Sequence, residues 1–540
     1  MESKCCSFAQ LRIRVNEAEP PPRRRPYPPL ARFRTLALLA LLACTEPGDP
    51  GTLNYYFYYD PRSLDPALST DVPTGEVIAL LFDNLTQFDA EGRLSPGLAE
   101  RWEVSGAGTL YTFHLRHNAR FHDGRAITAP VVRQSYLRAL DPGTRGGRAW
   151  PLFPIAGAQA HAGGDTTATV GIDAPDDSTL VIRLAAPLNV FPKLLAMPVT
   201  AIVPTPAPVD FDLHPVGSGP WRFVSWGHDD ALLFARNADY WGEVPKADSL
   251  RIRIIPEAIT QAAEYESGHL SVVEVPYGET RLWRERRPAE LQTRAALRAT
   301  YVAINTTRGP LRDVRVRQAL NHAVDIPTIL ANLAGGRGLP AAGAVPPGLP
   351  GYDSTRSPYR YDPAEARRLL AEAGYGNGLT LKLWRSQRPE YARIVQAMQQ
   401  DLGAVGITVE IVERDASSAR AAARKGEADL FFTDWYGDYP DAENFNFPLF
   451  YSGNRGPGGN LAFLADSALD DMILTARATT DSALKVRLDR AIDQRVFDLA
   501  PWIFCWFPVD LWAMRAEVVG WRIPAIFNGQ RWQAAHHLRP

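Results

Sequence analysis

The sequence predicts an α/β fold with a partly parallel sheet, and the observations that predict it lie in the C-terminal half. Residues 379–383 and 407–411 alternate between apolar and polar side chains, as strands with one buried face do. Between them, apolar residues recur at helical spacing from 394 to 405, and Gly406 ends that helix. Two strands that enclose a helix form a β-α-β unit, in which the strands run parallel.

Further elements are expected on both sides of this unit. Asp362 is a typical helix cap, and Glu365, three residues later, completes the pattern of a capping box. The spacing also predicts a helix over residues 314–324, with Asp313 as its cap. Residues 429–435 are expected to form another strand.

The N-terminal half contains more connecting segments. An aromatic strand is expected over residues 55–59, an alternating strand over 111–116 and a helix over 130–140. Tracts near 155–165 and 204–220 are rich in Gly, Pro and Ala, which is typical of connections.

Charge and length restrict the class of protein. The 540 residues allow three or four domains at roughly 150 residues each. The 58 basic and 60 acidic residues leave a formal net charge of −2. A nucleic-acid-binding surface needs a basic excess, so no nucleic-acid partner is expected.

The N-terminus carries the pattern of an export signal. Positive charge at Arg32 and Arg34 precedes an apolar run over residues 36–43, which Cys44 closes. Eight apolar residues are too few to span a bilayer as a helix, which takes roughly 20. The residues before Cys44 resemble a bacterial lipobox, so Cys44 is the predicted lipidation site, and residues 1–43 are the predicted leader. An ordinary signal peptide with a chance cysteine is the alternative.

Cysteine and histidine give no metal or disulfide pattern. Besides Cys44, the cysteines are Cys5, Cys6 and Cys505, and no two of the four have the spacing of metal ligands. His114 and His117 point to opposite faces of the expected strand, and no carboxylate or cysteine completes a set. Neither a metal nor another cofactor is expected.

Catalytic motifs are also missing from the sequence. There is no His-Glu-x-x-His, no Gly-x-Ser-x-Gly elbow and no Walker-type phosphate loop. The chain is therefore predicted not to be an enzyme. Paired acids such as Asp434 and Asp438 could mimic a glycosidase dyad, so a secreted hydrolase stays open as the alternative from a different class.

Six separated blocks resemble the bacterial extracellular solute-binding proteins of family 5, the oligopeptide- and dipeptide-binding proteins of ABC importers. The blocks occur in the order of that family and cover nearly the whole chain after the leader. They are the segments 98–140, 216–221, 236–241, 305–325, 362–375 and 435–441.

The resemblance implies a two-lobed periplasmic-binding-protein fold (type II, closing about a hinge) with an additional domain. It assigns lobe I to residues 44–88, 204–298 and 505–540, the extra domain II to 89–203, and lobe III to 299–504. Trp502, Trp506 and Trp512 are expected to pack in lobe I.

The segment from Trp435 to Asp441 ends a predicted strand, where open α/β sheets place ligands. By the resemblance, Asp438 takes the amine of a peptide ligand and Trp435 packs on the ligand backbone, while Tyr436 and Gly437, between them, complete the predicted ligand-binding set. Asp438 could instead be only a turn residue, and Asp441 is interpreted as a helix cap.

The predicted function is a lipid-anchored, monomeric receptor on the periplasmic or outer side of the membrane. It captures peptides and delivers them to the permease subunits of an ABC importer and their ATPases. The same fold could bind another solute instead, such as an oligosaccharide or a nickel chelate, and family resemblance does not separate these ligands.

Overall fold

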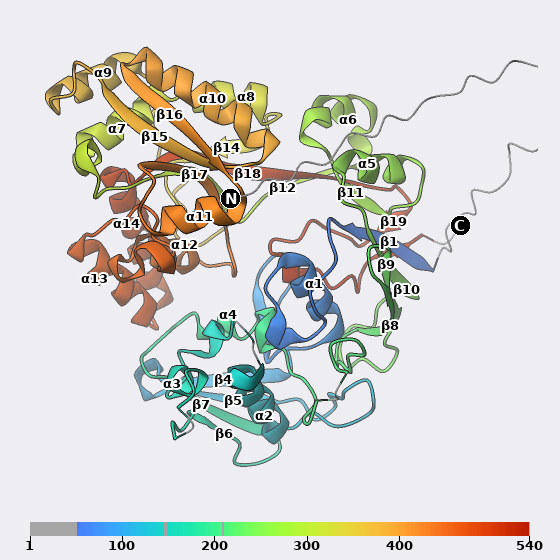
Figure 1. Ribbon diagram of the computed structural model, residues 1–540. Helices are drawn as coiled ribbons and strands as arrows, with labels where there is room; N and C mark the ends of the chain where they lie inside the picture. Colours follow the sequence, from blue (N-terminus) through green and yellow to red (C-terminus); the bar gives the residue numbers. More distant parts are fainter. Residues whose placement is uncertain (1–50, 145, 147, 166, 208–209, 539–540) are drawn as a thin grey trace, which may run out of the picture. The chain divides into compact units, whose positions relative to one another are not determined.

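The computed structural model describes residues 51–538, except 145, 147, 166 and 208–209. The predicted leader over residues 1–43 and the predicted lipidation site Cys44 lie outside the described residues. Within them, no helix is both long and apolar enough to cross a membrane. Helices and strands alternate along the described chain, and the strands form several separate sheets (Figure 1).

A four-stranded sheet joins the start of the described chain to its middle, in the order β1-β10-β9-β8. The first pair, β1 and β10, is parallel, and the other two pairs are antiparallel. The aromatic strand expected over 55–59 is confirmed up to Phe57, after which Tyr58 and Tyr59 are exposed. The bounds are β1 (Thr52–Phe57), β8 (Trp221–Gly227), β9 (Ala231–Arg236) and β10 (Ser249–Ile254).

A second, fully antiparallel sheet has the order β4-β5-β7-β6. One face of β5 is buried, because Tyr111, Phe113 and Leu115 alternate with more exposed residues. The strand and the helix expected in this region are confirmed as β5 and α2. The bounds are β4 (Ala99–Ser105), β5 (Leu110–Leu115), β6 (Ile172–Asp173), β7 (Thr179–Arg183), α2 (Ala129–Leu140), α3 (Ala158–Ala162) and α4 (Phe191–Leu194).

The largest sheet has eight strands and is mixed. Its main path is β11-β18-β13-β17-β15-β16, and β12 and β14 also pair with β18. The strand expected over 429–435 is confirmed as β17. The bounds are β11 (Val272–Glu274), β12 (Leu291–Ala295), β13 (Arg298–Ile304), β14 (Gly338–Pro340), β15 (Leu379–Ser386), β16 (Ile407–Arg414), β17 (Leu430–Tyr436) and β18 (Trp502–Met514).

The predicted β-α-β unit is confirmed within this sheet. β15 and β16 pair in parallel from Leu379 opposite Ile407 to Ser386 opposite Arg414, and α10 (Pro389–Ala404) connects them (orange in Figure 1). Apolar residues of α10, among them Val395 and Met398, are fully buried in the core beside this sheet. The periodicity of the sequence was sufficient here because the unit is local in the chain.

Asp362 is the cap of α9 (Pro363–Glu372), as predicted, and its carboxylate accepts hydrogen bonds from the N–H groups of Ala364 and Glu365. The capping box itself does not form. The Glu365 carboxylate pairs with Arg368, and the N–H of Asp362 donates to the carbonyl of His322. Asp313 caps α7 (Val314–Ala323), which confirms the other predicted helix.

The remaining elements lie between these sheets along the chain. The short strands form two pairs, β2 with β3 and β19 with β20. Their bounds are β2 (Thr86–Phe88), β3 (Leu94–Pro96), β19 (Val518–Val519) and β20 (His536–His537). The other helices are α1 (Val72–Leu81), α5 (Ala258–Glu266), α6 (Thr280–Arg286), α8 (Ile326–Leu333), α11 (Ala416–Arg424), α12 (Glu443–Phe450), α13 (Ser467–Ala478) and α14 (Ser482–Leu499).

Strand β18 spans 13 residues and passes from one hydrophobic core to the next. Trp502 stacks on Tyr301 with ring centroids 3.6 Å apart, Trp506 belongs to the core around α10, and Trp512 borders the core around β1. The three tryptophans therefore lie in or beside different hydrophobic cores, and their assignment to one lobe stays a prediction. The predicted lobe boundary at residue 505 falls inside this continuous strand, and the division into lobes stays a prediction.

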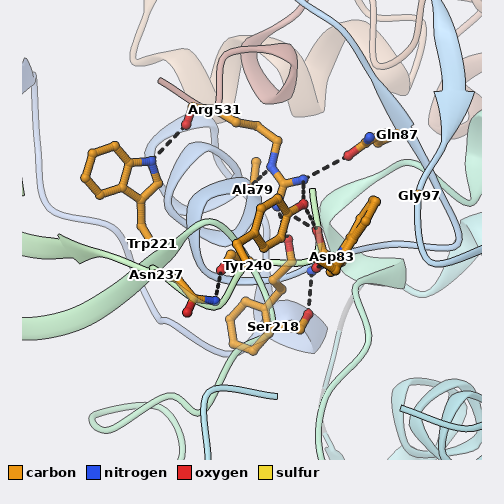
Figure 2. Close-up of polar contacts among 12 residues, drawn as sticks. Ala79, Asp83, Gln87, Gly97, Ser218, Trp221, Asn237, Tyr240 and Arg531 are labelled. Carbon is orange, nitrogen blue, oxygen red and sulfur yellow. Dashed lines mark hydrogen bonds and ion pairs between the residues drawn. The ribbon is translucent and has the colours of Figure 1, made fainter. Parts of the chain in front are cut away.

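A buried polar network ties the C-terminal segment to the end of α1 (Figure 2). Arg531 donates to the carbonyls of Ala79 and Phe82 and pairs with Asp83 at 2.8 Å. The hydroxyl of Tyr240 donates to the same Asp83 carboxylate. Because an unpaired buried charge is costly, this network holds three distant segments of the chain together around α1.

Candidate ligand-binding site

Two neighbouring cavities lie around the N-terminal end of α1. The first cavity has a volume of about 110 Å³ and the second about 100 Å³. Val72 and Phe527 line both, so the two cavities share a wall. The first is lined by residues 69–72, Arg148, Trp150, 197–199, Asp438 and Phe527. The second is lined by Tyr55, Val72, Glu76, Ala296, Leu297, Tyr436, Asp510, Trp512, Trp521, 523–527, Gln530 and Trp532.

Asp438 lines the first cavity, two residues after the end of β17. Its backbone N–H donates to the side-chain oxygen of Asn444 at 2.8 Å, which fixes the turn between β17 and α12. Burial raises the pKa of the Asp438 carboxyl, and Arg148 and Asn444 oppose that rise. Arg148 lines the same cavity and donates to the carbonyl of Thr70 at 3.0 Å. The carboxyl is therefore partly withdrawn from water and available to a positively charged group.

The other three predicted ligand-binding residues have different surroundings. Tyr436 lines the second cavity and is 45% exposed. Trp435 lines neither of the two cavities, and its indole N–H donates to the carbonyl of Asn444 at 3.0 Å. Gly437 donates its N–H to the carbonyl of Leu297 at 2.8 Å. The structure thus brings Asp438 and Tyr436 to the cavities, while Trp435 and Gly437 shape the loop that carries them.

The second cavity contains two carboxyl groups that sequence reasoning missed, those of Glu76 and Asp510. Burial raises the pKa of Glu76 to about 8. Burial and the nearby Glu274 raise the pKa of Asp510 to about 6, although arginines around it oppose the rise. No sequence motif marks either residue, because Glu76 is one turn inside a helix and Asp510 lies in a long apolar strand.

Arg298 begins β13 beside the second cavity's Tyr436, with its guanidinium carbon 5.5 Å from the centre of that ring. It donates to the hydroxyl of Tyr277 at 3.3 Å, while its Nε is buried without a hydrogen-bond partner within the described part of the chain. Arg298 was not singled out in the sequence either, since an arginine at a strand end is common.

Asp441 has a structural role that agrees in part with the prediction of a cap. Its carboxylate accepts from the N–H of Glu443 at the start of α12. It also pairs with Lys193 and Lys485, each at 2.6 Å. Burial alone would raise its pKa, but the two lysines hold the pKa of Asp441 at about 2. Asp441 is therefore a buried ion-pair centre that lies one residue before Ala442, the N-cap of α12, and accepts a hydrogen bond from the first residue of that helix.

Metal binding has no geometric support in the described residues. Among residues 51–538, apart from the gaps given above, no group of three or more His, Cys, Asp or Glu side chains could hold a metal ion. His114, one of the two histidines considered above as metal ligands, has its Nε2 atom 3.5 Å from Oε1 of Glu103 in the neighbouring strand.

The sheets and cavities belong to a known class of fold, that of periplasmic solute-binding proteins. The structure is similar to HbpA2 from Haemophilus parasuis, with a TM-score of 0.79 and 26% identity, covering 90% of this chain and 100% of that chain. It is also similar to the periplasmic binding protein DppA from Helicobacter pylori in complex with the peptide STSA. That likeness has a TM-score of 0.74 and 24% identity, covering 90% of this chain and 98% of that chain. These similarities confirm the expected fold class.

The particular family follows from the sequence. Residues 93–457 match the family described as bacterial extracellular solute-binding proteins, family 5 Middle, and the chain belongs to this family. A relative in Escherichia coli O1:K1 / APEC, the glutathione-binding protein GsiB, is 32% identical over 455 residues, which are 82% of this chain and 86% of the relative. The chain is therefore a solute-binding protein of the kind that serves ABC importers, and the predicted family resemblance is confirmed.

Proposed function

We propose that this protein captures peptides with a free amine between its lobes and delivers them to the permease of an ABC importer. The observation that carries the proposal is Asp438, a partly desolvated carboxyl that lines the first cavity. A charge-assisted hydrogen bond to an ammonium group is stronger in such a site than at an open surface. The similarity to a glutathione-binding protein supports a peptide ligand.

The proposed ligand contact predicts a selective effect of one substitution. Asp438→Asn removes the negative charge that would bind the ligand's ammonium group. A hydrogen bond to a charged group contributes about 1.5–3 kcal/mol, which corresponds to a loss of about 10- to 100-fold in peptide affinity. Calorimetry should show this loss for a peptide with a free amine, and little change for the same peptide with an acetylated amine.

Asp471→Asn is the matched control, because Asp471 is exposed on α13, a helix that lines neither cavity. This control should keep full affinity for both peptides. Undiminished affinity of the Asp438→Asn protein for the free-amine peptide would contradict the role assigned to Asp438.

The anchor is also part of the proposal: Cys44 carries the lipid and holds the protein on the periplasmic or outer side of the membrane. Native mass spectrometry of protein purified from its own host tests both anchor and ligand. We expect an N-terminus at lipid-modified Cys44 and a set of bound short peptides. A bound oligosaccharide or nickel chelate would replace the peptide proposal, and turnover of model substrates that depends on Asp434 or Asp438 would indicate a hydrolase.

A further inference from the structure

The second cavity contains two carboxyl groups that no other side chain of the described chain neutralises. Neither Glu76 nor Asp510 forms a side-chain hydrogen bond or an ion pair with a described residue, yet both line the same cavity of about 100 Å³. Both residues are partly buried, and carboxyl groups withdrawn from water normally have a partner, because withdrawal without one is costly. Within the described residues, the two carboxyl groups therefore face the cavity without a partner of opposite charge.

The described cations near this cavity form no ion pair with its two carboxyl groups. Arg337 pairs with Glu274 at 3.0 Å. Arg294 donates to three backbone carbonyls, and Arg298 donates to the hydroxyl of Tyr277. These three arginines lower the pKa of Asp510 from a distance without forming an ion pair with it. The lining of the cavity therefore contains two carboxyl groups and no lysine or arginine.

Aromatic rings form a second feature of the same cavity. Tyr55 lies 6.2 Å from Trp512 and 4.9 Å from Trp532, and Trp521 lies 5.5 Å from Trp512 and 6.1 Å from Trp532, measured between ring centroids. All four residues line the cavity, and each ring contacts two others. Aromatic rings attract organic cations through their faces, by about 0.5–2 kcal/mol each.

We propose that the second cavity is a subsite for an organic cation, the ammonium or guanidinium group of a ligand side chain, held by Glu76 and Asp510 against these rings. An anion would be repelled by the carboxyl groups. Ca²⁺ and Mg²⁺ prefer six or more oxygen ligands, which a wall built mainly of aromatic carbon does not supply. The subsite rests on the proposed function, because the shared wall at Val72 and Phe527 places it next to the cavity of Asp438. A basic peptide is then the preferred class of ligand.

The two carboxyl groups also make the subsite sensitive to pH. The titratable groups around Glu76 are Tyr55, Tyr56 and Tyr59, with Tyr436 and Asp510 on the walls of the same cavity. With a raised pKa, Glu76 holds its proton at neutral pH and must release it when a cation binds. Binding of the cation should therefore release protons and become tighter as the pH rises toward about 8.

The experiment compares matched probes by calorimetry on the ligand-free full chain. Alanine tripeptides in which one residue is lysine are compared with the same peptides carrying norleucine, with the substitution at each position in turn. Free arginine is compared with citrulline, which has the same shape without the charge. Each probe is measured on the unchanged protein, on Glu76→Gln, on Asp510→Asn and on the control Glu285→Gln, whose exposed carboxylate lies on α6.

We expect the best lysine peptide to bind at least tenfold more tightly than its norleucine partner. Glu76→Gln and Asp510→Asn should each remove most of that preference and keep the affinity for norleucine peptides, whereas Glu285→Gln should change neither. Buffers of different ionisation enthalpy should show proton release at pH 7 with lysine peptides only.

Equal affinity for the lysine and norleucine peptides would overturn the subsite and leave peptide capture intact. If no peptide binds while arginine binds better than citrulline through Glu76, the subsite stands and peptide capture is wrong; if no probe binds, both are wrong.

Discussion

Asp438 and Glu76 lie on neighbouring cavities in different electrostatic surroundings. Burial raises the pKa of both, but the charge of Arg148 opposes the rise at Asp438, whereas no cation has a comparable effect on Glu76. The pKa of Glu76, at about 8, therefore favours a neutral carboxylic acid in the second cavity at neutral pH. The same type of side chain thus has two roles, which its surroundings determine.

This difference predicts how stability depends on pH. The pKa of Glu76 is raised in the folded chain to about 8 from an ordinary value near 4.5. Its contribution to the free energy of unfolding is complete below pH 4.5 and is lost as the pH rises to about 8. The loss is at most about 5 kcal/mol, and partial exposure of the carboxyl group to water makes it smaller. The glutamine side chain of the Glu76→Gln protein cannot ionise, so this protein should not show that loss of stability.

The measurement is the thermal midpoint of ligand-free protein at pH 5 and at pH 9. The thermal midpoint of the Glu76→Gln protein minus that of the unchanged protein should be larger at pH 9 than at pH 5. Glu285→Gln, the exposed counterpart, should show no such trend. A difference between Glu76→Gln and the unchanged protein that stays constant from pH 5 to pH 9 would show that Glu76 is not held as a neutral acid.

Single residues were predictable where their neighbours in the sequence belong to a family motif. Asp438 and Tyr436 belong to such a motif and do line the two cavities. Glu76 and Asp510 do not; they are 434 positions apart in the sequence and meet only through the tertiary fold. The role proposed for them depends on carboxyl groups that lack a partner among the described residues, which a linear sequence does not display.

The loop Gly217–Gly219 closes the C-terminal end of α1 and fixes the helix that carries Glu76. The N–H groups of Ser218 and Gly219 donate to the carbonyl of Leu81, and the hydroxyl of Ser218 accepts from the N–H of Asp83. A Cβ atom on Gly217 would lie 1.8 Å from the carbonyl oxygen of Leu81. The glycine is therefore needed for close packing of two backbones.

Gly217→Ala should accordingly destabilise the protein, because either α1 or the loop must move. Overpacking of this kind costs about 1–3 kcal/mol, and differential scanning calorimetry should show a lower Tm. Gly403→Ala is the opposite case, since its Cβ would meet no atom within 4 Å and Gly403 lies in α10. Alanine there should stabilise the helix by about 0.5–1 kcal/mol. An unchanged or higher Tm for Gly217→Ala would mean that the loop is not tightly packed.

At the scale of elements, local units were predictable and distant pairings were not. The unit of β15, α10 and β16 was expected from periodicity, and its strands follow one another in the chain. The apolar run of β18 contacts β11, β12, β13 and β14, which are separated from it by more than 150 residues. A run of apolar residues shows that a strand is buried, but it does not identify the strands beside it.

Two parts of the chain that are predicted to belong to different domains are connected by a buried ion pair. Lys193, in α4, lies 2.6 Å from the Asp441 carboxylate and also donates to the carbonyl of Pro440. Asn189 adds hydrogen bonds from its side-chain amide to the carbonyls of Ala476 and Thr479. The hinge movement expected of this family would have to break these contacts when the ligand leaves.

Lys193 and Lys485 provide a matched pair of substitutions that tests this movement. Both lysines lie 2.6 Å from Asp441, but Lys485 is in α14, in the same predicted lobe as Asp441, whereas Lys193 belongs to the predicted extra domain. Truncating one partner of a buried charge pair costs about 2–5 kcal/mol.

Lys193→Met should therefore favour the arrangement in which the two predicted domains are separated. It should weaken peptide binding by at least about tenfold, mainly through faster release of the peptide. Lys485→Met should lower the Tm with little effect on release. Stopped-flow measurement of peptide dissociation distinguishes the two, and equal release rates for both variants would show that the Lys193–Asp441 pair only stabilises the fold.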